Sequence, residues 1–247
     1  MAFTHVYTLL IYFCLLHVFS GATTKHSTKL KIINKCNITI WPGILSNSWS
    51  AQPPSPTTGS FTLKPGKSYT LSISTPWSGR LWGQTNCTSG QGEGGNPTLQ
   101  APSTLVEFSL NRSSTGLDFY DVSLVDGYNL PVMVFPRGEN TSRCQATGCS
   151  ADLNVVCPKE LGVFMESEIV ACKSACAAFR KPEYCCNGPY AASTECKASS
   201  YSELFERWCP LAHSFAYDRT TTFSCAAEEY VVVFCPSSSL SRPSNYR

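Results

Sequence analysis

The sequence predicts a mainly β protein with a second lobe that is rich in disulfides and partly helical. Short segments of alternating apolar and polar residues recur between about residues 28 and 142, and clusters of Pro, Gly and Ser separate them. Repeated short strands with such turns are typical of a β-sandwich or barrel. Nine cysteines then lie between Cys144 and Cys209, a stretch too short to depend on apolar burial alone. Cross-links must therefore hold the second lobe.

The N-terminus predicts a secretory signal peptide over residues 1–22. Residues 6–19 form an apolar run too short to span a bilayer comfortably, and Ser20, Gly21 and Ala22 suit a cleavage site. An uncleaved anchor is the alternative, because no Lys or Arg precedes the run. Later segments are not long and apolar enough to span a membrane. We expect a secreted, extracellular protein with no stable membrane anchor.

Hydrophobic periodicity predicts the individual elements. The buried face of the first strand is expected to carry Leu30, Ile32, Cys36, Ile38 and Ile40. Further strands are expected over residues 68–74, 80–85, 104–110, 117–124, 131–135, 222–225 and 230–234, with the last strands rejoining the N-terminal sheet.

Two helices are expected in the cysteine-rich lobe. Ser200 and Glu203 have the spacing of a capping box, apolar residues follow at helical spacing, and Pro210 stops the run. This pattern predicts a helix of about three turns. A second helix is expected over residues 168–179.

Charge and cysteine content exclude several classes of function. Lys and Arg number 19 against 17 Asp and Glu, a formal net charge of +2, so no strongly basic face is available for nucleic acid. The 14 cysteines indicate an oxidising compartment. Removal of the signal peptide deletes Cys14 and leaves an odd number, so six disulfides and one leftover cysteine are expected. Glycosylation is expected at one or more of the acceptors Asn37, Asn86, Asn111 and Asn140.

Other motifs point to no cofactor and no metal. Gly90, Gly92 and Gly95 fit a dinucleotide fingerprint, but Pro97 follows where a helix should begin. His26 and His213 are the only histidines of the mature chain. A zinc site rich in histidine is therefore excluded, and a Ser-His-Asp triad would depend on His213 alone. We expect His213 to be a packed or surface residue.

Eight motifs together resemble the thaumatin-like proteins of plant defence, the pathogenesis-related osmotin and thaumatin type. In chain order they are CNITIWPG, SGRLWGQTNC, TLVEFSLN, LDFYDVSLVDGYNLP, YCCNG, YSELFERWCP, FAYDRTTTFSC and VVFCP. The match runs through nearly all of residues 29–236. The resemblance implies a thaumatin-like β-sandwich, a disulfide-rich lobe and a cleft between them.

With this resemblance the chain divides into five segments. They are the signal peptide 1–22, the first part of the β-sandwich 23–143, the disulfide-rich lobe 144–216, the last sandwich strands 217–238 and a C-terminal tail 239–247. The sequence departs from the family after Cys87, where TSGQGEGGNPTLQAPS replaces a longer hairpin that carries three more cysteines. A small family lobe is therefore expected to be missing.

The family also implies which cysteines pair. Carried over by position, the pairs are Cys36 with Cys235, Cys144 with Cys225, Cys149 with Cys209, Cys157 with Cys172, Cys176 with Cys185, and Cys186 with Cys196. The shortened segment removes the partner of Cys87. The resemblance therefore identifies Cys87 as the unpaired cysteine that the odd count requires.

The resemblance assigns an acidic cleft of one arginine and four acids: Arg80, Glu107, Asp121, Asp126 and Asp218. An Arg fork can hold carboxylates in a fixed geometry. From the residues alone a simpler interpretation stays open. Asp126 and Gly127 could form an ordinary turn, while Glu107 and Asp121 pair with surface cations.

The resemblance implies a secreted antifungal protein of the apoplast or vacuole. We expect a monomer that binds β-1,3-glucan or another fungal wall polysaccharide in the acidic cleft, with no cofactor and no nucleic-acid partner. A weak endo-β-1,3-glucanase is the first alternative, with Glu107 and Asp126 as catalytic pair. The second alternative is an inhibitor of a foreign polysaccharide-degrading enzyme that acts through surface loops.

Overall fold

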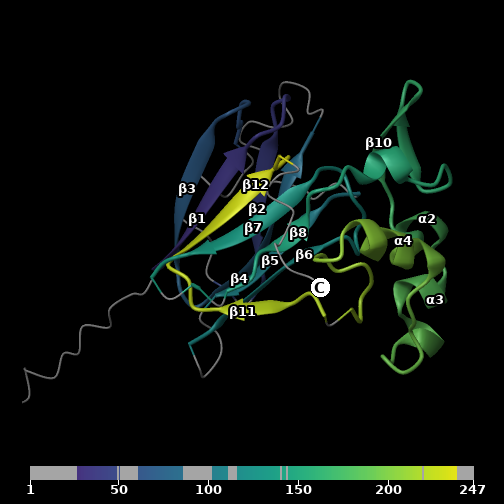
Figure 1. Ribbon diagram of the computed structural model, residues 1–247. Helices are drawn as coiled ribbons and strands as arrows, with labels where there is room; N and C mark the ends of the chain where they lie inside the picture. The colour runs from purple at the N-terminus through teal and green to yellow at the C-terminus, as the bar shows by residue number, and fades with distance from the viewer. Residues whose placement is uncertain are drawn as a thin grey trace, which may run out of the picture.

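Figure 1 shows the computed structural model, in which a β-sandwich and a smaller helical lobe lie side by side. The structure describes residues 27–48, 50, 61–85, 102–110, 116–139, 141–142, 144–218 and 220–237. The predictions for the signal peptide, the C-terminal tail, His26 and Cys87 lie outside these residues, as do those for Asn86, Asn111 and Asn140. The same holds for the shortened segment after Cys87, apart from its last two residues, Pro102 and Ser103.

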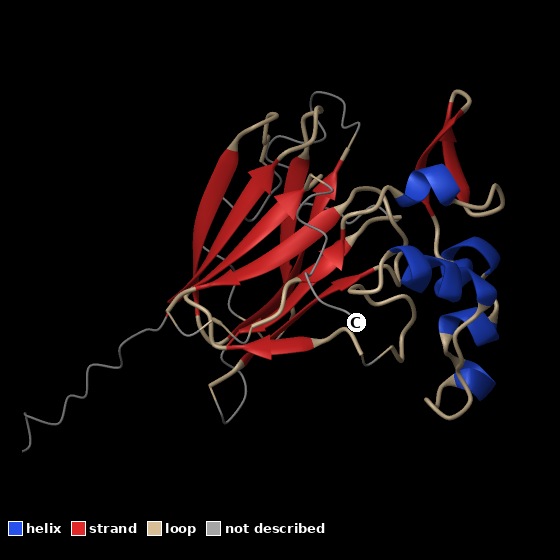
Figure 2. Ribbon diagram, in the orientation of Figure 1, coloured by secondary structure: helices blue, strands red, loops and turns tan. Residues whose placement is uncertain are grey.

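Two five-stranded sheets form the sandwich (Figure 2). The first has the order β3-β1-β12-β7-β8 and consists of β1 (Ser27–Asn34), β3 (Ser68–Ser74), β7 (Val132–Arg137), β8 (Thr147–Cys149) and β12 (Glu229–Phe234). The second has the order β11-β6-β5-β4-β2 and consists of β2 (Trp41–Ser46), β4 (Trp77–Gln84), β5 (Leu105–Leu110), β6 (Asp118–Ser123) and β11 (Phe223–Cys225). The predicted fold class, a mainly β sandwich with a disulfide-rich lobe, is confirmed.

The last strand lies inside the first sheet, between two strands from earlier in the chain. β12 pairs in parallel with β1 and antiparallel with β7. The expectation that the final strands rejoin the N-terminal sheet is therefore confirmed. Because β8 extends the same sheet, the change from sandwich to lobe falls after β8 rather than at Cys144.

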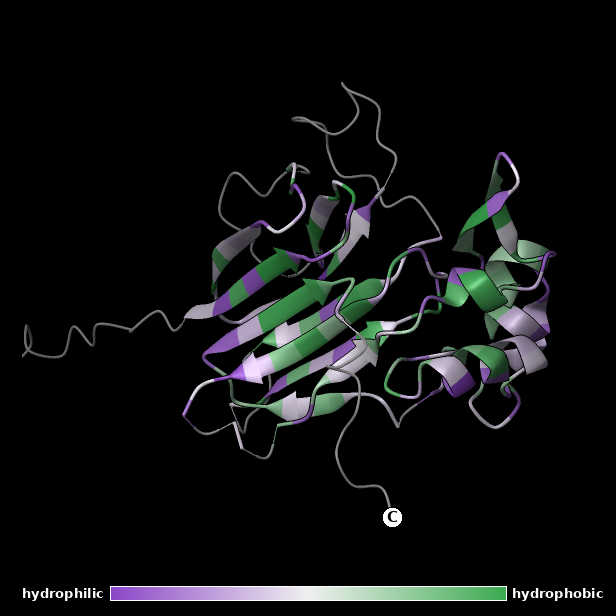
Figure 3. Ribbon diagram, turned by 45° about the horizontal axis from the view of Figure 1, so that its top comes forward, coloured by the Kyte–Doolittle hydropathy of each residue, from purple (hydrophilic) through white to green (hydrophobic). Residues whose placement is uncertain are grey.

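The alternation of side chains explains the core. Along β1 every second residue from Thr28 to Asn34 is buried, and Leu30 and Ile32 are fully enclosed. Figure 3 shows the same alternation of apolar and polar residues in the strands. The prediction for Ile38 is wrong, because this side chain is 42% exposed. The strand ends at Asn34, whose side-chain amide donates to the carbonyls of Ile38 and Leu63 and fixes the turn that follows.

The lobe contains short elements joined by disulfides. They are η1 (Leu153–Val156), β9 (Gly162–Met165), β10 (Glu168–Cys172), α2 (Ala175–Phe179), α3 (Pro182–Cys185), η2 (Gly188–Tyr190) and α4 (Ser200–Trp208). No helix of the described residues is long and apolar enough to cross a bilayer.

Two helix predictions need correction. Residues 168–179 are not one helix, because β10 pairs with β9 and α2 starts only after Ser174, whose side chain accepts from the Ala177 amide. The helix α4 exists as predicted, but its capping box is one residue earlier. Ser199 accepts from the Ser202 amide, and the Ser202 hydroxyl accepts from the Ser199 amide.

Six disulfides occur among the described residues, and they are the six pairs that the resemblance implied. They join Cys36 to Cys235, Cys144 to Cys225, Cys149 to Cys209, Cys157 to Cys172, Cys176 to Cys185 and Cys186 to Cys196. The first closes the sandwich, since it joins the segment after β1 to the end of β12. The last three lie wholly within the lobe.

Candidate functional site

Three of the five cleft residues lie directly opposite one another on neighbouring strands. Arg80 on β4 faces Glu107 on β5, and Glu107 faces Asp121 on β6. Their neighbours Leu81, Val106 and Val122 are fully buried in the core. Because side chains alternate across a strand, the three polar side chains share the outer face of the second sheet. We call Arg80, Glu107 and Asp121 the sheet row.

The sheet row continues onto the next strand. β11 pairs with β6, with Phe223 opposite Tyr120. The preceding residue, Thr222, therefore comes beside Asp121. Its side chain is exposed. Thr222 was not among the residues that the sequence singled out.

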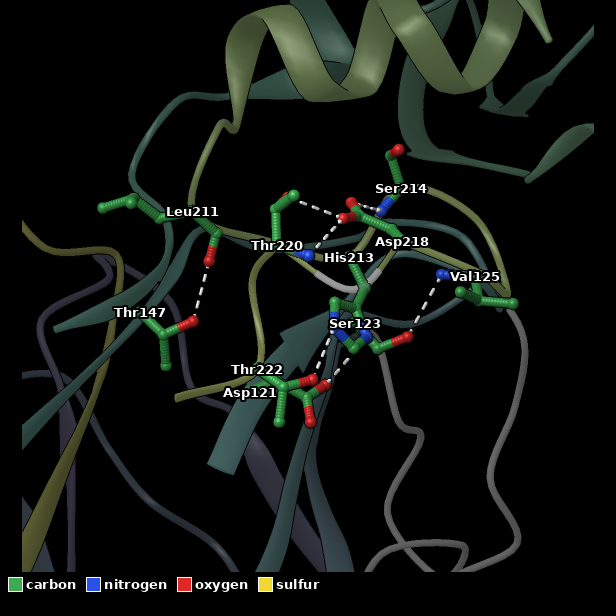
Figure 4. A network of polar contacts seen from close by, with 10 residues as sticks. All are labelled: Asp121, Ser123, Val125, Thr147, Leu211, His213, Ser214, Asp218, Thr220 and Thr222. Carbon is green, nitrogen blue, oxygen red and sulfur yellow. Dashed lines mark hydrogen bonds and ion pairs between the residues drawn. The ribbon is translucent and has the colours of Figure 1, made fainter. Parts of the chain in front are cut away.

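The imidazole of His213 contacts both Asp121 and Thr222. The Nδ1 of His213 lies 3.3 Å from Oδ2 of Asp121, and its Nε2 lies 3.0 Å from Oγ1 of Thr222. The backbone of His213 is fixed to β6, because its amide donates to Val122 and its carbonyl accepts from Leu124. Figure 4 shows Asp121 and Thr222 both directed toward the imidazole. His213 is a partly buried, packed residue as expected, and the sequence did not indicate its two polar contacts.

The fourth acid, Asp218, is held by its own loop. One of its carboxylate oxygens accepts from the Ser214 amide at 3.3 Å, and the other accepts from the amide and hydroxyl of Thr220 at 3.2 and 2.8 Å. These bonds fix the conformation of the loop that leads from the lobe back to β11 (Figure 4). Asp218 is buried, so it acts on the sheet row mainly through its charge.

Asp126 lies in the turn after β6 rather than on a strand of the sheet row. The residue lines a cavity of about 650 Å³ between the turn after β6 and the lobe. Lobe residues on this cavity include Arg180, Glu183, Tyr184 and Tyr201. Of the five cleft residues, all of them described, Asp126 alone lines this cavity. The charge of Asp126 nevertheless acts on Glu107, so this turn and the sheet row are electrostatic neighbours.

The turn interpretation of Asp126 and Gly127 also holds as local structure. The Gly127 amide donates to the Leu124 carbonyl at 2.9 Å, and Gly127 has a φ of +100°. A Cβ at this position would come within 2.5 Å of Cβ of Pro102 and within 2.7 Å of the Cys172 carbonyl oxygen. The turn therefore needs glycine, and it presents Asp126 to the cavity. The other part of that interpretation is wrong for Asp121, whose ion-pair partner is His213 rather than a surface Lys or Arg.

Burial changes the protonation of the sheet row. Desolvation raises the pKa of Glu107, the Arg80 charge opposes this, and the Asp126 charge adds to it. Desolvation, with the charges of Glu107 and Asp218, raises the pKa of Asp121 to about 8. Burial lowers the pKa of His213, opposed by Asp218. The acids of the cleft therefore carry less negative charge near neutrality than their number suggests.

Fold and site together define a class of protein, a disulfide-braced β-sandwich with a helical lobe and a polar row on one outer sheet face. The chain belongs to the thaumatin family, whose family model matches residues 34–236. It is thus a thaumatin-like protein of the pathogenesis-related type.

Curated relatives cover almost the whole chain. A pathogenesis-related thaumatin-like protein 3.5 of Cryptomeria japonica is 43% identical over 90% of this chain and 95% of its own length. A thaumatin-like protein 1 of Castanea sativa is 44% identical over 93% of this chain and 99% of its own. Among solved structures, a laminaripentaose-producing β-1,3-glucanase of Paenibacillus barengoltzii matches with a TM-score of 0.53 at 12% identity, over 85% of this chain and 75% of the other. This last match shows a shared fold only.

Proposed function

We propose that this chain is a secreted antifungal defence protein that binds β-1,3-glucan or a related fungal wall polysaccharide along the sheet row. The observation that carries the proposal is the register of Arg80, Glu107 and Asp121, which places a cation and two acids side by side on one outer sheet face. Family membership supports the defence role, since the Cryptomeria relative is named as pathogenesis-related.

The chemistry of the row suits a neutral sugar polymer. Carboxyl and guanidinium groups fixed by strand register can exchange hydrogen bonds with ring hydroxyls without being reorganised. Phe119 lies two residues before Asp121 on β6, hence on the same face, and is 40% exposed. An exposed aromatic ring beside polar groups offers an apolar face against which a sugar ring can stack. Both kinds of contact that recognise a polysaccharide are therefore adjacent.

A pull-down of the secreted, oxidised protein on insoluble β-1,3-glucan tests the proposal. Glu107→Gln and Phe119→Ala are expected to weaken retention, because each removes one kind of contact. Glu228→Gln is the matched control, since this exposed acid precedes β12 in the other sheet. Retention that is equal in all four proteins, or absent in the unsubstituted one, would contradict glucan binding by the sheet row.

A weak endo-β-1,3-glucanase is the second candidate. Its support is the raised pKa of Glu107, because a general acid must hold its proton near working pH. Asp126 is electrostatically coupled to Glu107 and would be the second carboxyl group. Release of reducing ends from laminarin, lost in both Glu107→Gln and Asp126→Asn, would support hydrolysis. Glucan binding without release of reducing ends would support a binding protein and contradict the glucanase.

Secretion and glycosylation are part of the proposal. The side chain of Asn37 is exposed in the turn that follows β1, where an oligosaccharide transferase can reach it. Removal of N-glycans from the secreted protein is expected to lower its mass, and Asn37→Gln should reduce that loss by one glycan. A secreted protein whose mass is unchanged by the treatment would contradict glycosylation.

A further inference from the structure

A continuous chain of polar contacts leads from a partly buried acid to an exposed hydroxyl. It runs from Asp121 Oδ2 to His213 Nδ1 at 3.3 Å, and from His213 Nε2 to Thr222 Oγ1 at 3.0 Å. The side chains of Asp121 and His213 are 13% and 17% exposed, whereas Thr222 is exposed. The imidazole therefore connects the Asp121 carboxyl group of the sheet row to the exposed hydroxyl of Thr222 (Figure 4).

We propose that Asp121, His213 and Thr222 form a proton relay, in which the state of the Asp121–His213 pair decides whether the Thr222 hydroxyl donates a hydrogen bond outward to a ligand. This inference rests on the proposed polysaccharide binding along the sheet row. It adds Thr222 as a ligand-contacting residue and His213 as the positioning residue that controls it.

The proton count explains how the relay works. When the pair holds its extra proton, that proton lies between Asp121 and Nδ1, and the Nε2 hydrogen donates to the Thr222 oxygen. The Thr222 hydroxyl hydrogen is then free to donate outward. When the pair loses the proton, the remaining imidazole hydrogen moves to Nδ1 and donates to the Asp121 carboxylate. Nε2 becomes an acceptor, and the Thr222 hydroxyl turns inward to donate to it.

The surroundings of the pair favour the protonated arrangement. Oδ2 of Asp121 is buried and has no hydrogen bond within the described part of the chain, so the imidazole at 3.3 Å is its polar contact. Acidic charges act on the pair from Glu107 on β5 and from Asp218 in the loop after His213. Arg80 on β4 and Asp126 after β6 act on Glu107 in turn. Because Glu107 and Asp218 both act on Asp121, a further negative charge on the Asp121 carboxyl group is costly until the solution becomes alkaline.

The pKa shifts of Asp121 and His213 agree with a pair that keeps its extra proton at neutral pH. Burial and neighbouring acids raise the pKa of Asp121 to about 8, and burial lowers the pKa of His213. Above the lowered pKa of His213 and below the pKa of Asp121, the pair holds one extra proton and has no net charge. A neutral polysaccharide should then meet an outward-facing donor at Thr222 under acidic and neutral conditions.

The relay can be tested in the intact, oxidised protein without any ligand. Nitrogen-15 NMR distinguishes the two neutral tautomers of histidine, and the mature sequence contains only His26 and His213, so assignment needs one His213→Gln spectrum. We expect His213 to carry its hydrogen on Nε2 at neutral pH and to change to the Nδ1 tautomer as the pH passes about 8. In Asp121→Asn this change should disappear. A tautomer that stays constant from neutral to alkaline pH, or a simple titration near the ordinary histidine pKa of about 6.5, would overturn the relay.

Retention on insoluble β-1,3-glucan then tests the role of Thr222. The unsubstituted protein should be retained less above about pH 8. Thr222→Val should bind about threefold to tenfold more weakly at neutral pH, the effect of one hydrogen bond, and should lose the alkaline step. Thr222→Ser, which keeps the hydroxyl, should restore both. Retention that is the same for Val and Ser variants at every pH would overturn the ligand contact at Thr222.

The two experiments separate the relay from the proposed function. A tautomer change without glucan retention at any pH would contradict polysaccharide binding but confirm proton sharing. Glucan retention without the tautomer change would confirm binding and overturn the relay.

Discussion

The hydroxyl of Tyr230 donates a 2.8 Å hydrogen bond to Oδ2 of Asp118, and this bond joins the two sheets inside the sandwich. Tyr230 belongs to β12 of the first sheet and Asp118 to β6 of the second. Both side chains are buried, at 0% and 4% exposure. Burial and the Asp118 charge raise the pKa of Tyr230, so its hydroxyl remains a donor.

Tyr230→Phe is therefore expected to destabilise the fold without affecting the site. The substitution leaves a buried carboxyl oxygen without this donor, at a cost of about 1–3 kcal/mol. For a chain of this size that corresponds to a decrease in Tm of roughly 2–4 °C per kcal/mol. Calorimetry provides the measurement and glucan retention at low temperature the control. An unchanged Tm would show that the bond contributes nothing.

The sheet row itself could be predicted only in part. Alternation along residues 104–110 and 117–124 places Glu107 and Asp121 on the polar face of their strands. The register that sets them opposite each other depends on long-range pairing, which one sequence does not specify. The resemblance provided the grouping of the five cleft residues, but not the position of Asp126 on the wall of the cavity beside the lobe.

The contacts of His213 and Thr222 escaped prediction for a physical reason. His213 joins β6 through an isolated parallel bridge to Ser123, made by a segment without strand periodicity. No local pattern marks such a contact. The available signal was indirect, since Thr222 lies at the start of a predicted strand that must pair with a sheet edge. The helix over residues 168–179 failed for a related reason, because pairing of β10 with β9 overrode the local pattern.

Asp121 makes the stability of the protein depend on pH. The pKa of this residue rises from 3.8 to about 8 on folding, so the folded chain keeps a proton that the unfolded chain has released. Stability therefore falls as the pH rises toward 8. The lowered pKa of His213 works in the opposite direction, but only below its ordinary value of 6.5. Between about pH 6.5 and 8 the His213 contribution is absent, and the raised pKa of Asp121 makes stability fall as the pH rises.

We accordingly expect Asp121→Asn to flatten this dependence. From pH 6.5 to 8 the unsubstituted protein should lose at most ~2 kcal/mol, about 1.4 per pH unit for a single proton. Denaturant titration at several pH values measures this loss. Glu228→Gln, a matched change of an exposed acid to its amide, should keep the full slope. A slope that persists in Asp121→Asn would assign it to another group.

Gly127→Ala tests how the turn presents Asp126. Because Gly127 has a φ of +100° and a Cβ there would meet Pro102 and the Cys172 carbonyl, the substitution should cost roughly 1–3 kcal/mol. We expect a lower Tm together with a shift of amide resonances in the turn. Gly66→Ala is the control, since Gly66 has a φ of +73° but open space around it. Equal losses in both variants would mean that backbone strain, not crowding, determines the cost.

Reduction is expected to open the lobe before the sandwich. The helices of the lobe bury few apolar side chains, and α3 and η2 bury none. Disulfides typically contribute about 2–4 kcal/mol each. The lobe adds only a few apolar residues, such as Leu153, Leu161 and Phe205, to the core that the strands share, so it depends on disulfides more than the sandwich does. Hydrogen exchange under mild reductant should show loss of protection first in α2, α3 and α4. Earlier exchange in β1 and β12 would contradict this order.

The last prediction concerns Cys87. Thirteen cysteines follow the predicted signal peptide, and the six disulfides of the structure use twelve of them, so Cys87 is the cysteine left over. A leftover cysteine in a secreted protein either stays a thiol or forms a bridge to another molecule. We expect a thiol, because Asn86, Cys87 and Thr88 form a glycosylation acceptor, and a glycan there would hinder an approaching partner.

Alkylation of the unreduced secreted protein followed by peptide mapping measures this directly. One label at Cys87 is the expected result, and Cys87→Ser, which leaves the six disulfides intact, should take up none. A protein that runs as a dimer without reductant and as a monomer with it would instead show an intermolecular bridge at Cys87. Labels spread over residues 144–209 would mean that the pairs seen in the structure are not those of the secreted protein, and the disulfide framework of the lobe would have to be reassigned.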